Sequence, residues 1–138
     1  MKKIYLVLIL FLFASCVHQV SRSEVYSRQA WNKLTDLEIS QLLSQKSNPD
    51  ALSRLGDHFA GPDHDNMGGA SLYFDALKIN PDHVQANYGA GEYYLHIYWY
   101  QKAVLHFEKV ARFANKNSPE HIRANMVLKY LKQEMSKK

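Results

Sequence analysis

A segment in the middle of the chain repeats itself at a nearly fixed spacing, and this repeat restricts the fold more than any other feature. Residues 55–59 (Leu-Gly-Asp-His-Phe) align with residues 90–94 (Ala-Gly-Glu-Tyr-Tyr) at an offset of 35. A second set aligns at an offset of 34: Gly69 with Ala103, Tyr73 with Phe107, Ala76 with Val110 and Leu77 with Ala111. The one-residue difference falls in residues 61–66, a turn sequence where an insertion costs little. Self-similarity at this period predicts helical hairpins that stack on their neighbours.

The alternation of small and aromatic residues in this repeat resembles the tetratricopeptide repeat (TPR) family. The family motif places a small residue at its eighth position, where two helices cross closely, and an aromatic residue three positions later, which fills the space that remains between the helices. The matches are Gly56 and Gly91 at the eighth position, with Phe59 and Tyr94 three residues later. The sequence departs from the motif at Asn87, where Trp or Leu is usual, and at Asn115, where Pro is usual.

The resemblance implies an all-α fold, a short TPR-like α-solenoid of helical hairpins with flanking capping helices. The two repeats cover residues 48–82 and 83–117, and a basic capping helix covers residues 118–138. Helices in residues 24–47 would cap the other end or form a degenerate repeat. Two repeats are few for a stable stack, so these flanking helices should complete the core. No segment of strand length alternates with period two, so we expect no sheet.

The N-terminal helices carry their own local signals. We expect one helix over residues 24–33. A second should begin at Thr35, because Thr35 and Glu38 have the spacing of a capping box. An apolar stripe should follow on this helix, formed by Leu37, Ile39, Leu42 and Leu43.

The first fifteen residues have the layout of a secretory signal. Two lysines precede an apolar run over residues 4–13, and small residues follow at positions 14 and 15. The apolar run is too short to cross a bilayer, which takes about 20 residues. Residues 13–16 (Phe-Ala-Ser-Cys) resemble the bacterial lipobox, with Phe where Leu is usual. This resemblance implies lipidation of Cys16 by diacylglyceryl and palmitate-type acyl chains, cleavage before it, and a lipidated tether over residues 16–23. The alternative is an uncleaved signal anchor with an incidental cysteine.

The residue after Cys16 bears on location. Gram-negative lipoproteins that stay at the inner membrane tend to carry Asp there, and this chain has Val17. The resemblance therefore implies an outer-membrane lipid anchor with the domain facing the periplasm. In a host with a single membrane, the anchor would lie in the cell membrane.

The TPR resemblance also implies a binding groove along the first helix of each pair. We carried the family's groove positions onto this sequence, with Ser118 as the first residue of a third half-repeat. Among the resulting positions, the residues expected to bind a partner are Asp50, Ser53, Asp57, Gln85, Tyr88, Glu92, His96, Lys129 and Tyr130. Such a surface suits an extended peptide or a partner helix. The alternative is that these residues only solvate a scaffold face.

Charge is unevenly distributed along the chain. Residues 16–108 hold seven Lys or Arg and eleven Asp or Glu, a net charge of −4. Residues 109–138 hold eight and two, a net charge of +6. The basic C-terminal helix could meet an acidic protein, anionic lipid headgroups or lipopolysaccharide, or it could be a solvated cap. Nucleic acid is not an expected partner of an exported protein.

An aromatic cluster lies between the two helices of the second repeat. Its members are Tyr93, Tyr94, His96, Tyr98, Trp99 and Tyr100. Stacking on peptidoglycan is one interpretation, and packing between hairpins is the other, since the motif assigns packing roles to Tyr94 and Tyr100.

Metal binding, cofactors and catalysis are not expected. Asp57, His58 and residues 63–65 are metal-capable, but their spacing matches no zinc motif. The single cysteine excludes an internal disulfide, and no nucleophile or acid–base pair is recognisable.

These features predict a membrane-anchored adaptor or scaffold lipoprotein, not an enzyme. It would mediate protein–protein interaction during envelope assembly, for example of a pilus, secretion or cell-wall machinery. The alternatives are a peptidoglycan-associated structural lipoprotein and a regulatory subunit of an envelope hydrolase or protease.

Overall fold

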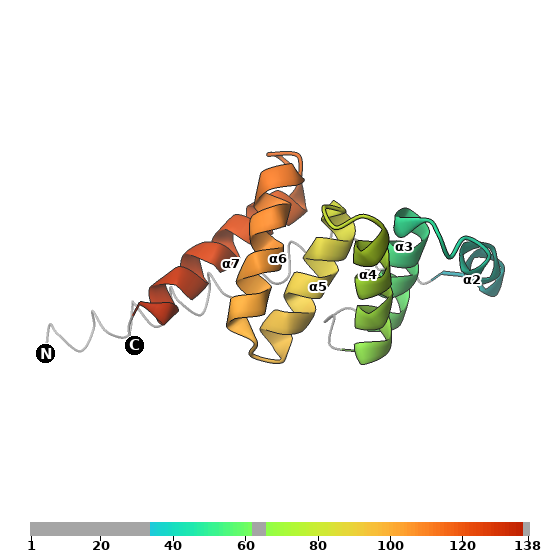
Figure 1. Cartoon of the computed structure of the whole chain (residues 1–138), viewed down its shortest axis with the longest axis horizontal. Helices are drawn as coiled ribbons and strands as arrows, with labels where there is room; N and C mark the ends of the chain where they lie inside the picture. Colours follow the sequence, from blue (N-terminus) through green and yellow to red (C-terminus); the bar gives the residue numbers. More distant parts are fainter. Residues whose placement is uncertain (1–33, 62–65, 137–138) are drawn as a thin grey trace, which may run out of the picture. The chain divides into compact units, whose positions relative to one another are not determined.

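The computed structural model describes residues 34–61 and 66–136, and the regular elements in these ranges are all α-helices (Figure 1). They are α2 (Asp36–Leu43), α3 (Pro49–Ala60), α4 (Met67–Ile79), α5 (Val84–His96), α6 (Tyr100–Phe113) and α7 (Pro119–Met135). The predicted all-α class is thus confirmed. The predicted signal, Cys16, the tether and the helix over residues 24–33 lie outside the described residues. No helix in the described ranges is long and apolar enough to cross a membrane.

Local capping signals define the helix starts. At α2, the Glu38 amide donates to Thr35 Oγ1 at 3.3 Å and the Thr35 amide donates to Glu38 Oε2 at 2.8 Å, which is the predicted capping box. At α3, the Asn48 side chain accepts from the Asp50 amide at 3.0 Å, and Pro49 occupies the first turn.

The first helices of successive hairpins begin at evenly spaced caps. Asn48, His83 and Ser118 cap α3, α5 and α7, and each side chain accepts a hydrogen bond from an amide in the first helical turn. Successive caps are 35 residues apart, which is the offset of the sequence repeat. Helix α7 therefore occupies the place of the first helix of a third repeat, with Pro119 at its first position.

The helices pack as TPR-like hairpins. Helix α3 pairs with α4, and α5 pairs with α6 through a short turn (Figure 1). Helix α4 packs on α5, and α6 packs on α7. The first helices also contact one another, α3 with α5 and α5 with α7, while α2 packs on α3.

Glycines opposite aromatic rings explain the close approach of the helices. Tyr73 on α4 is fully buried, and its ring occupies the space that a Cβ on Gly56 of α3 or on Gly89 of α5 would need. Gly91 faces Phe107 in the same way, with 3.1 Å between an added Cβ and the ring Cζ. The predicted roles of Gly56 and Gly91 are thus confirmed, and Gly89 is a further small residue that the motif did not indicate.

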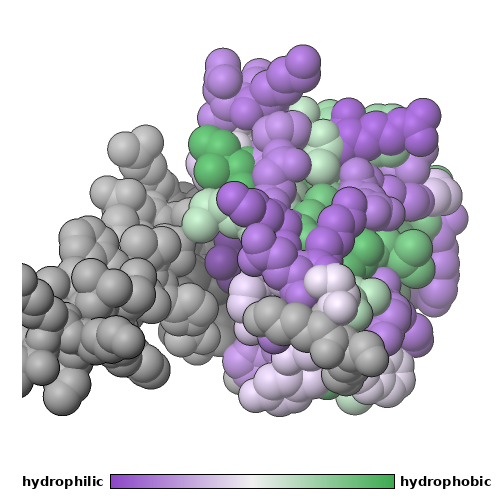
Figure 2. Space-filling model, turned by 90° about the vertical axis from the view of Figure 1, so that its left-hand side faces the viewer, coloured by the Kyte–Doolittle hydropathy of each residue, from purple (hydrophilic) through white to green (hydrophobic). Residues whose placement is uncertain are grey.

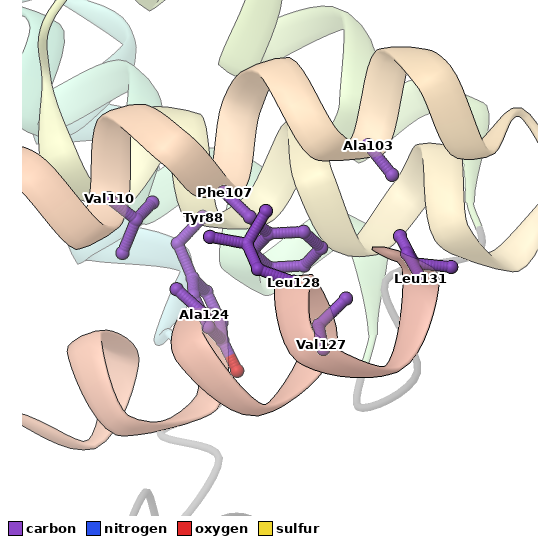
Figure 3. Packing of buried hydrophobic residues seen from close by; sticks show 8 residues of the cluster. All are labelled: Tyr88, Ala103, Phe107, Val110, Ala124, Val127, Leu128 and Leu131. Atoms are coloured by element: carbon purple, nitrogen blue, oxygen red, sulfur yellow. The ribbon is translucent and has the colours of Figure 1, made fainter. Parts of the chain in front are cut away.

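The C-terminal helix completes the core, as predicted. Side chains of α5, α6 and α7 meet in one buried cluster (Figure 3). Its members are Tyr88, Ala103, Phe107, Val110, Ala124, Val127, Leu128 and Leu131. Because α7 fills the surface that the second hairpin would otherwise expose, the stack does not depend on two hairpins alone.

Two packing predictions were wrong. Phe59 is 43% exposed and makes an edge contact with His58 at 4.9 Å between ring centroids. The next residue, Ala60, lies so close to Gly69 of α4 that no ring fits between these helices. In α2, Leu42 is buried but Leu37 and Leu43 are exposed, since this short helix packs on α3 with one face.

Candidate functional site

The nine predicted groove residues differ in how much surface they offer. Four are exposed, namely Asp50, His96, Lys129 and Tyr130. Two are half-buried, Asp57 and Gln85. Three are buried, Ser53, Tyr88 and Glu92. In this conformation a partner can therefore touch the first two groups, and the third group has structural contacts.

The first cross-helix contact joins α3 to the cap of α5. His83 Nδ1 accepts from the Ala86 amide at 3.2 Å and lies 3.3 Å from Ser53 Oγ. Because Nδ1 is an acceptor, the ring proton sits on Nε2 and points to Asp50 Oδ1 at 2.8 Å. Ser53 and Asp50 thus hold the start of the next hairpin.

The second contact joins three helices at Asp57. Its Oδ1 accepts from the Tyr73 hydroxyl at 2.7 Å, and its Oδ2 accepts from Gln85 Nε2 at 2.7 Å. Burial, together with the neighbouring Asp57 carboxylate, raises the pKa of Tyr73, so the hydroxyl stays protonated and donates. Both carboxylate oxygens are engaged, and α3, α4 and α5 are fixed relative to one another.

The third contact joins α5 to α7. Arg123 Nε donates to Glu92 Oε1 at 2.9 Å, and Nη2 donates to Oε2 at 3.4 Å. Glu92 is 5% exposed, and because water does not solvate its carboxylate there, Arg123 supplies the compensating charge. Sequence reasoning did not select Arg123, but the spacing of the caps could have indicated it.

The cap register moves the groove positions of α7 by one residue. With Pro119 first, the second, fifth, ninth and twelfth positions are Glu120, Arg123, Val127 and Tyr130. Tyr130 belongs to the groove set in both registers, whereas Lys129 lies one position before it. The Glu92–Arg123 pair supports the cap register, because it places Arg123 on the side of α7 that faces α5.

A shallow hollow lies at the N-terminal ends of α5 and α7. Its volume is about 620 Å³. It brings together Asp50, Gln85 and Glu120, which are the second residues of α3, α5 and α7. Asp82, His83 and Ser118 also line it, together with Asn80, Val84, Phe113, Ala114 and Asn115.

The basic C-terminal segment is partly neutralised within the domain. Lys109 pairs with Asp82 at 3.1 Å, and Lys132 lies 3.8 Å from Glu108. With Arg123 on Glu92, three of its cations meet acidic residues of the preceding segment. The face on the α7 side of the molecule is largely hydrophilic, with separate apolar spots (Figure 2). These contacts agree with a solvated cap, one of the two expected alternatives, and contact with an acidic protein or anionic lipid stays a prediction.

The aromatic cluster is largely a packing element. Tyr94 stacks on Trp99 and on His106, with ring centroids 6.0 and 5.4 Å apart, and Tyr100 packs against the core. These roles were predicted for Tyr94 and Tyr100. Tyr93 is buried, while Tyr98 and Trp99 are exposed.

Asn87, which departs from the family motif, has a polar function. Its Nδ2 donates to the carbonyls of Pro81 and His83, both at 3.0 Å. Its Oδ1 lies 3.0 Å from His106 Nδ1 and accepts a hydrogen bond from the N–H there. Burial lowers the pKa of His106 to about 4, with Lys109 and Lys102 adding to the effect, so the ring is neutral at pH 7.

Within residues 34–61 and 66–136, no group of three His, Cys, Asp or Glu side chains is placed to hold a metal ion. His58 instead accepts a hydrogen bond from the Leu34 amide at 3.1 Å. No family model, curated protein or solved structure matches this chain.

Proposed function

We propose that the protein is a membrane-anchored scaffold lipoprotein whose helical domain binds an envelope protein or a peptide segment of one. The observation that carries this proposal is the side-by-side arrangement of α3, α5 and α7, with exposed predicted groove residues on each. The protein works by binding, without catalysis or a cofactor. Assembly of a pilus, secretion or cell-wall machine is the process we assign to it.

The residues at the two edges give this surface a direction. Asp50, Gln85 and Glu120 lie in the first turns of their helices, around the hollow. His96 ends α5, and Tyr130 lies in the C-terminal half of α7. One edge therefore carries the carboxylates of Asp50 and Glu120 and the other carries His96 and Tyr130, and this difference favours one orientation of an extended segment.

The cross-helix contacts support binding by keeping the helices at fixed spacing. Asp50–His83, Asp57–Gln85 and Glu92–Arg123 each join neighbouring first helices. A surface that is ordered before binding loses less conformational entropy when a partner arrives. We therefore assign the buried predicted residues a supporting role and the exposed ones the contact with the partner.

The anchor is assigned to Cys16. Several acyl chains hold a protein stably at a membrane, whereas one does not. In a host with two membranes we place the anchor in the outer membrane, with the domain in the periplasm. Regulation of an envelope hydrolase or protease would use the same binding surface and the same anchor.

Site-specific cross-linking in cells tests the binding surface. A photoreactive residue at Tyr130 or His96 should capture the same partner, and the capture should be lost when the other residue is changed to Ala. Ser71, exposed on the second helix of the first hairpin, α4, is the matched control and should capture nothing specific. Equal capture from all three positions would refute the groove assignment.

Acyl labelling tests the anchor. Cys16→Ser should abolish incorporation of a labelled fatty acid and release the protein from the membrane fraction. Unchanged labelling would show that Cys16 is not the lipidated residue.

A further inference from the structure

The turn between α5 and α6 ends α5 in an unusual way. The Trp99 amide donates to the Tyr94 carbonyl at 2.9 Å, and the Tyr98 amide donates to the Leu95 carbonyl at 3.2 Å. This pair of bonds is the Schellman motif that follows many helices. The motif needs a positive φ at the residue after the cap, and Tyr98 has φ 63° there. Glycine is usual at this place, because a side chain in the left-handed region is strained.

The strain at Tyr98 brings little packing in return. The side chain is 75% exposed, and its ring contact is an edge-to-face one with Tyr100 at 6.1 Å. Trp99 differs, because its stacking on Tyr94 is the apolar contact that usually accompanies the motif. A residue that breaks a local rule without internal compensation is a candidate for a function outside the domain.

The chemistry around Tyr98 points to a lipid interface. Trp99 is 53% exposed, and Lys102 Nζ lies 4.4 Å from its ring centroid. Leu105, one turn further on α6, is exposed as well. Residues 93–107 contain no Asp or Glu. Tyr and Trp with a neighbouring cation are the side chains that settle at the level of lipid headgroups.

The length of the chain between Cys16 and the domain puts the turn within reach of a bilayer. Residues 17–33 span at most about 60 Å when fully extended, and about 40 Å if residues 24–33 form the expected helix. Helices of this domain are about 20 Å long, and the turn lies at the end of one of them. A domain anchored at Cys16 can therefore place Tyr98 against the membrane.

We propose that the aromatic turn, Tyr98, Trp99 and Lys102, inserts into the interfacial region of the bilayer that carries the lipid anchor. The proposal rests on the anchor in the proposed function. Insertion would fix the orientation of the domain relative to the membrane, and with it the direction in which the surface of α3, α5 and α7 faces.

Fluorescence quenching in vesicles tests the insertion. The full chain with Trp31→Phe keeps Trp99 as its one tryptophan. Reconstituted into phosphatidylcholine vesicles, Trp99 emission should shift to the blue, and brominated acyl chains should quench it about twofold. Protein that floats with the vesicles but shows unquenched Trp99 would overturn the insertion alone. A chain that does not float would overturn the anchor and the insertion together.

Tyr98→Gly separates binding from folding. Glycine suits the positive φ, so this variant should unfold at the same or a higher temperature while Trp99 quenching falls. Phe113→Ala removes an exposed aromatic at the other end of α6 and should leave quenching unchanged. Unchanged quenching in Tyr98→Gly would contradict the proposal. Binding to purified peptidoglycan sacculi that Tyr98→Gly abolishes, without lipid quenching, would assign the turn to glycan instead.

Discussion

Arg123 on α7 forms a two-point ion pair with the buried carboxylate of Glu92 on α5, at 2.9 and 3.4 Å. The pair joins the helix that completes the core to the first helix of the second hairpin. Both residues stand at positions that a TPR-like register assigns to the binding groove. In this domain those positions hold the helices together, and the exposed positions beside them are the ones to which we assign partner binding.

Arg123→Met should destabilise the domain strongly. It leaves the Glu92 carboxylate buried without a counter-charge, which costs about 3–5 kcal/mol. Urea unfolding of the full chain measures the loss. Adding Glu92→Gln should recover part of it, because the buried charge is then removed.

Lys132→Met is the control for this ion pair. Lys132 and Glu108 are both exposed, so the change should cost at most about 1 kcal/mol. If Arg123→Met and Lys132→Met lower the free energy of unfolding equally, the Glu92–Arg123 pair contributes no more than a surface ion pair.

Gly89→Ala should lower the free energy of unfolding, even though Ala favours helices. The added Cβ overlaps the Tyr73 ring, and relieving such overpacking costs about 1–3 kcal/mol. Gly68→Ala is the comparison, since Gly68 is exposed in the first turn of α4 and its added Cβ would meet only the exposed Asn66 side-chain oxygen, at 3.1 Å, and no buried ring, so its loss of stability should be smaller than that of Gly89→Ala. Thermal unfolding compares the two, and a stabilised Gly89→Ala would contradict the packing described for Tyr73.

Phe107→Ala and Phe59→Ala should differ widely in effect. Phe107 is fully buried, and its truncation should cost about 3–5 kcal/mol. Phe59 is an exposed aromatic residue of the first hairpin, and its truncation should change the free energy of unfolding by about 0.5 kcal/mol or less. Denaturant midpoints provide the comparison. A large loss in Phe59→Ala would restore the packing role that the motif assigns to it.

Acidification should destabilise the domain in part through His106. Its pKa is about 4 in the folded state, below the ordinary value of 6.5, so the unfolded chain binds the proton more readily. The stability that neutral His106 confers is full above pH 6.5 and is lost as the pH falls toward 4. His106→Gln removes this titration, and its melting temperature should fall less steeply over that range. If the melting temperatures of the two proteins fall equally with pH, His106 makes no contribution to the acid sensitivity of the domain.

Much of the local structure followed from the sequence. Thr35 and Glu38 form their capping box, and Asn48, with Pro49 after it, starts α3, because these signals act over a few neighbouring residues. The repeat predicted small residues at Gly56 and Gly91, where two helices approach closely, and the structure showed that the rings of Tyr73 and Phe107 lie against them. The repeat preserves these small residues because the two helices of each hairpin can approach closely only where one side chain is small.

The exposure of the candidate site was decided by the tertiary structure. Ser53, Tyr88 and Glu92 match groove positions in sequence, yet neighbouring helices bury them. Burial depends on which elements meet at a face, and a motif written along one helix does not contain that information. Arg123 was missed for another reason: the groove positions of α7 were counted from Ser118, whereas the helix begins at Pro119, and counting from Pro119 moves Arg123 onto a groove position.

The sequence by itself therefore determined the helices, their caps and the period at which they stack, since each depends on neighbours within one repeat. Only the tertiary structure decided which predicted groove residues hold the helices together and which remain open to a partner. It also revealed the strained Tyr98, whose positive φ arises from how α5 ends and α6 begins. The physical reason is the sequence distance over which each interaction acts. Hydrogen bonds within a turn join near neighbours in the chain, whereas burial and charge compensation depend on contacts between different helices.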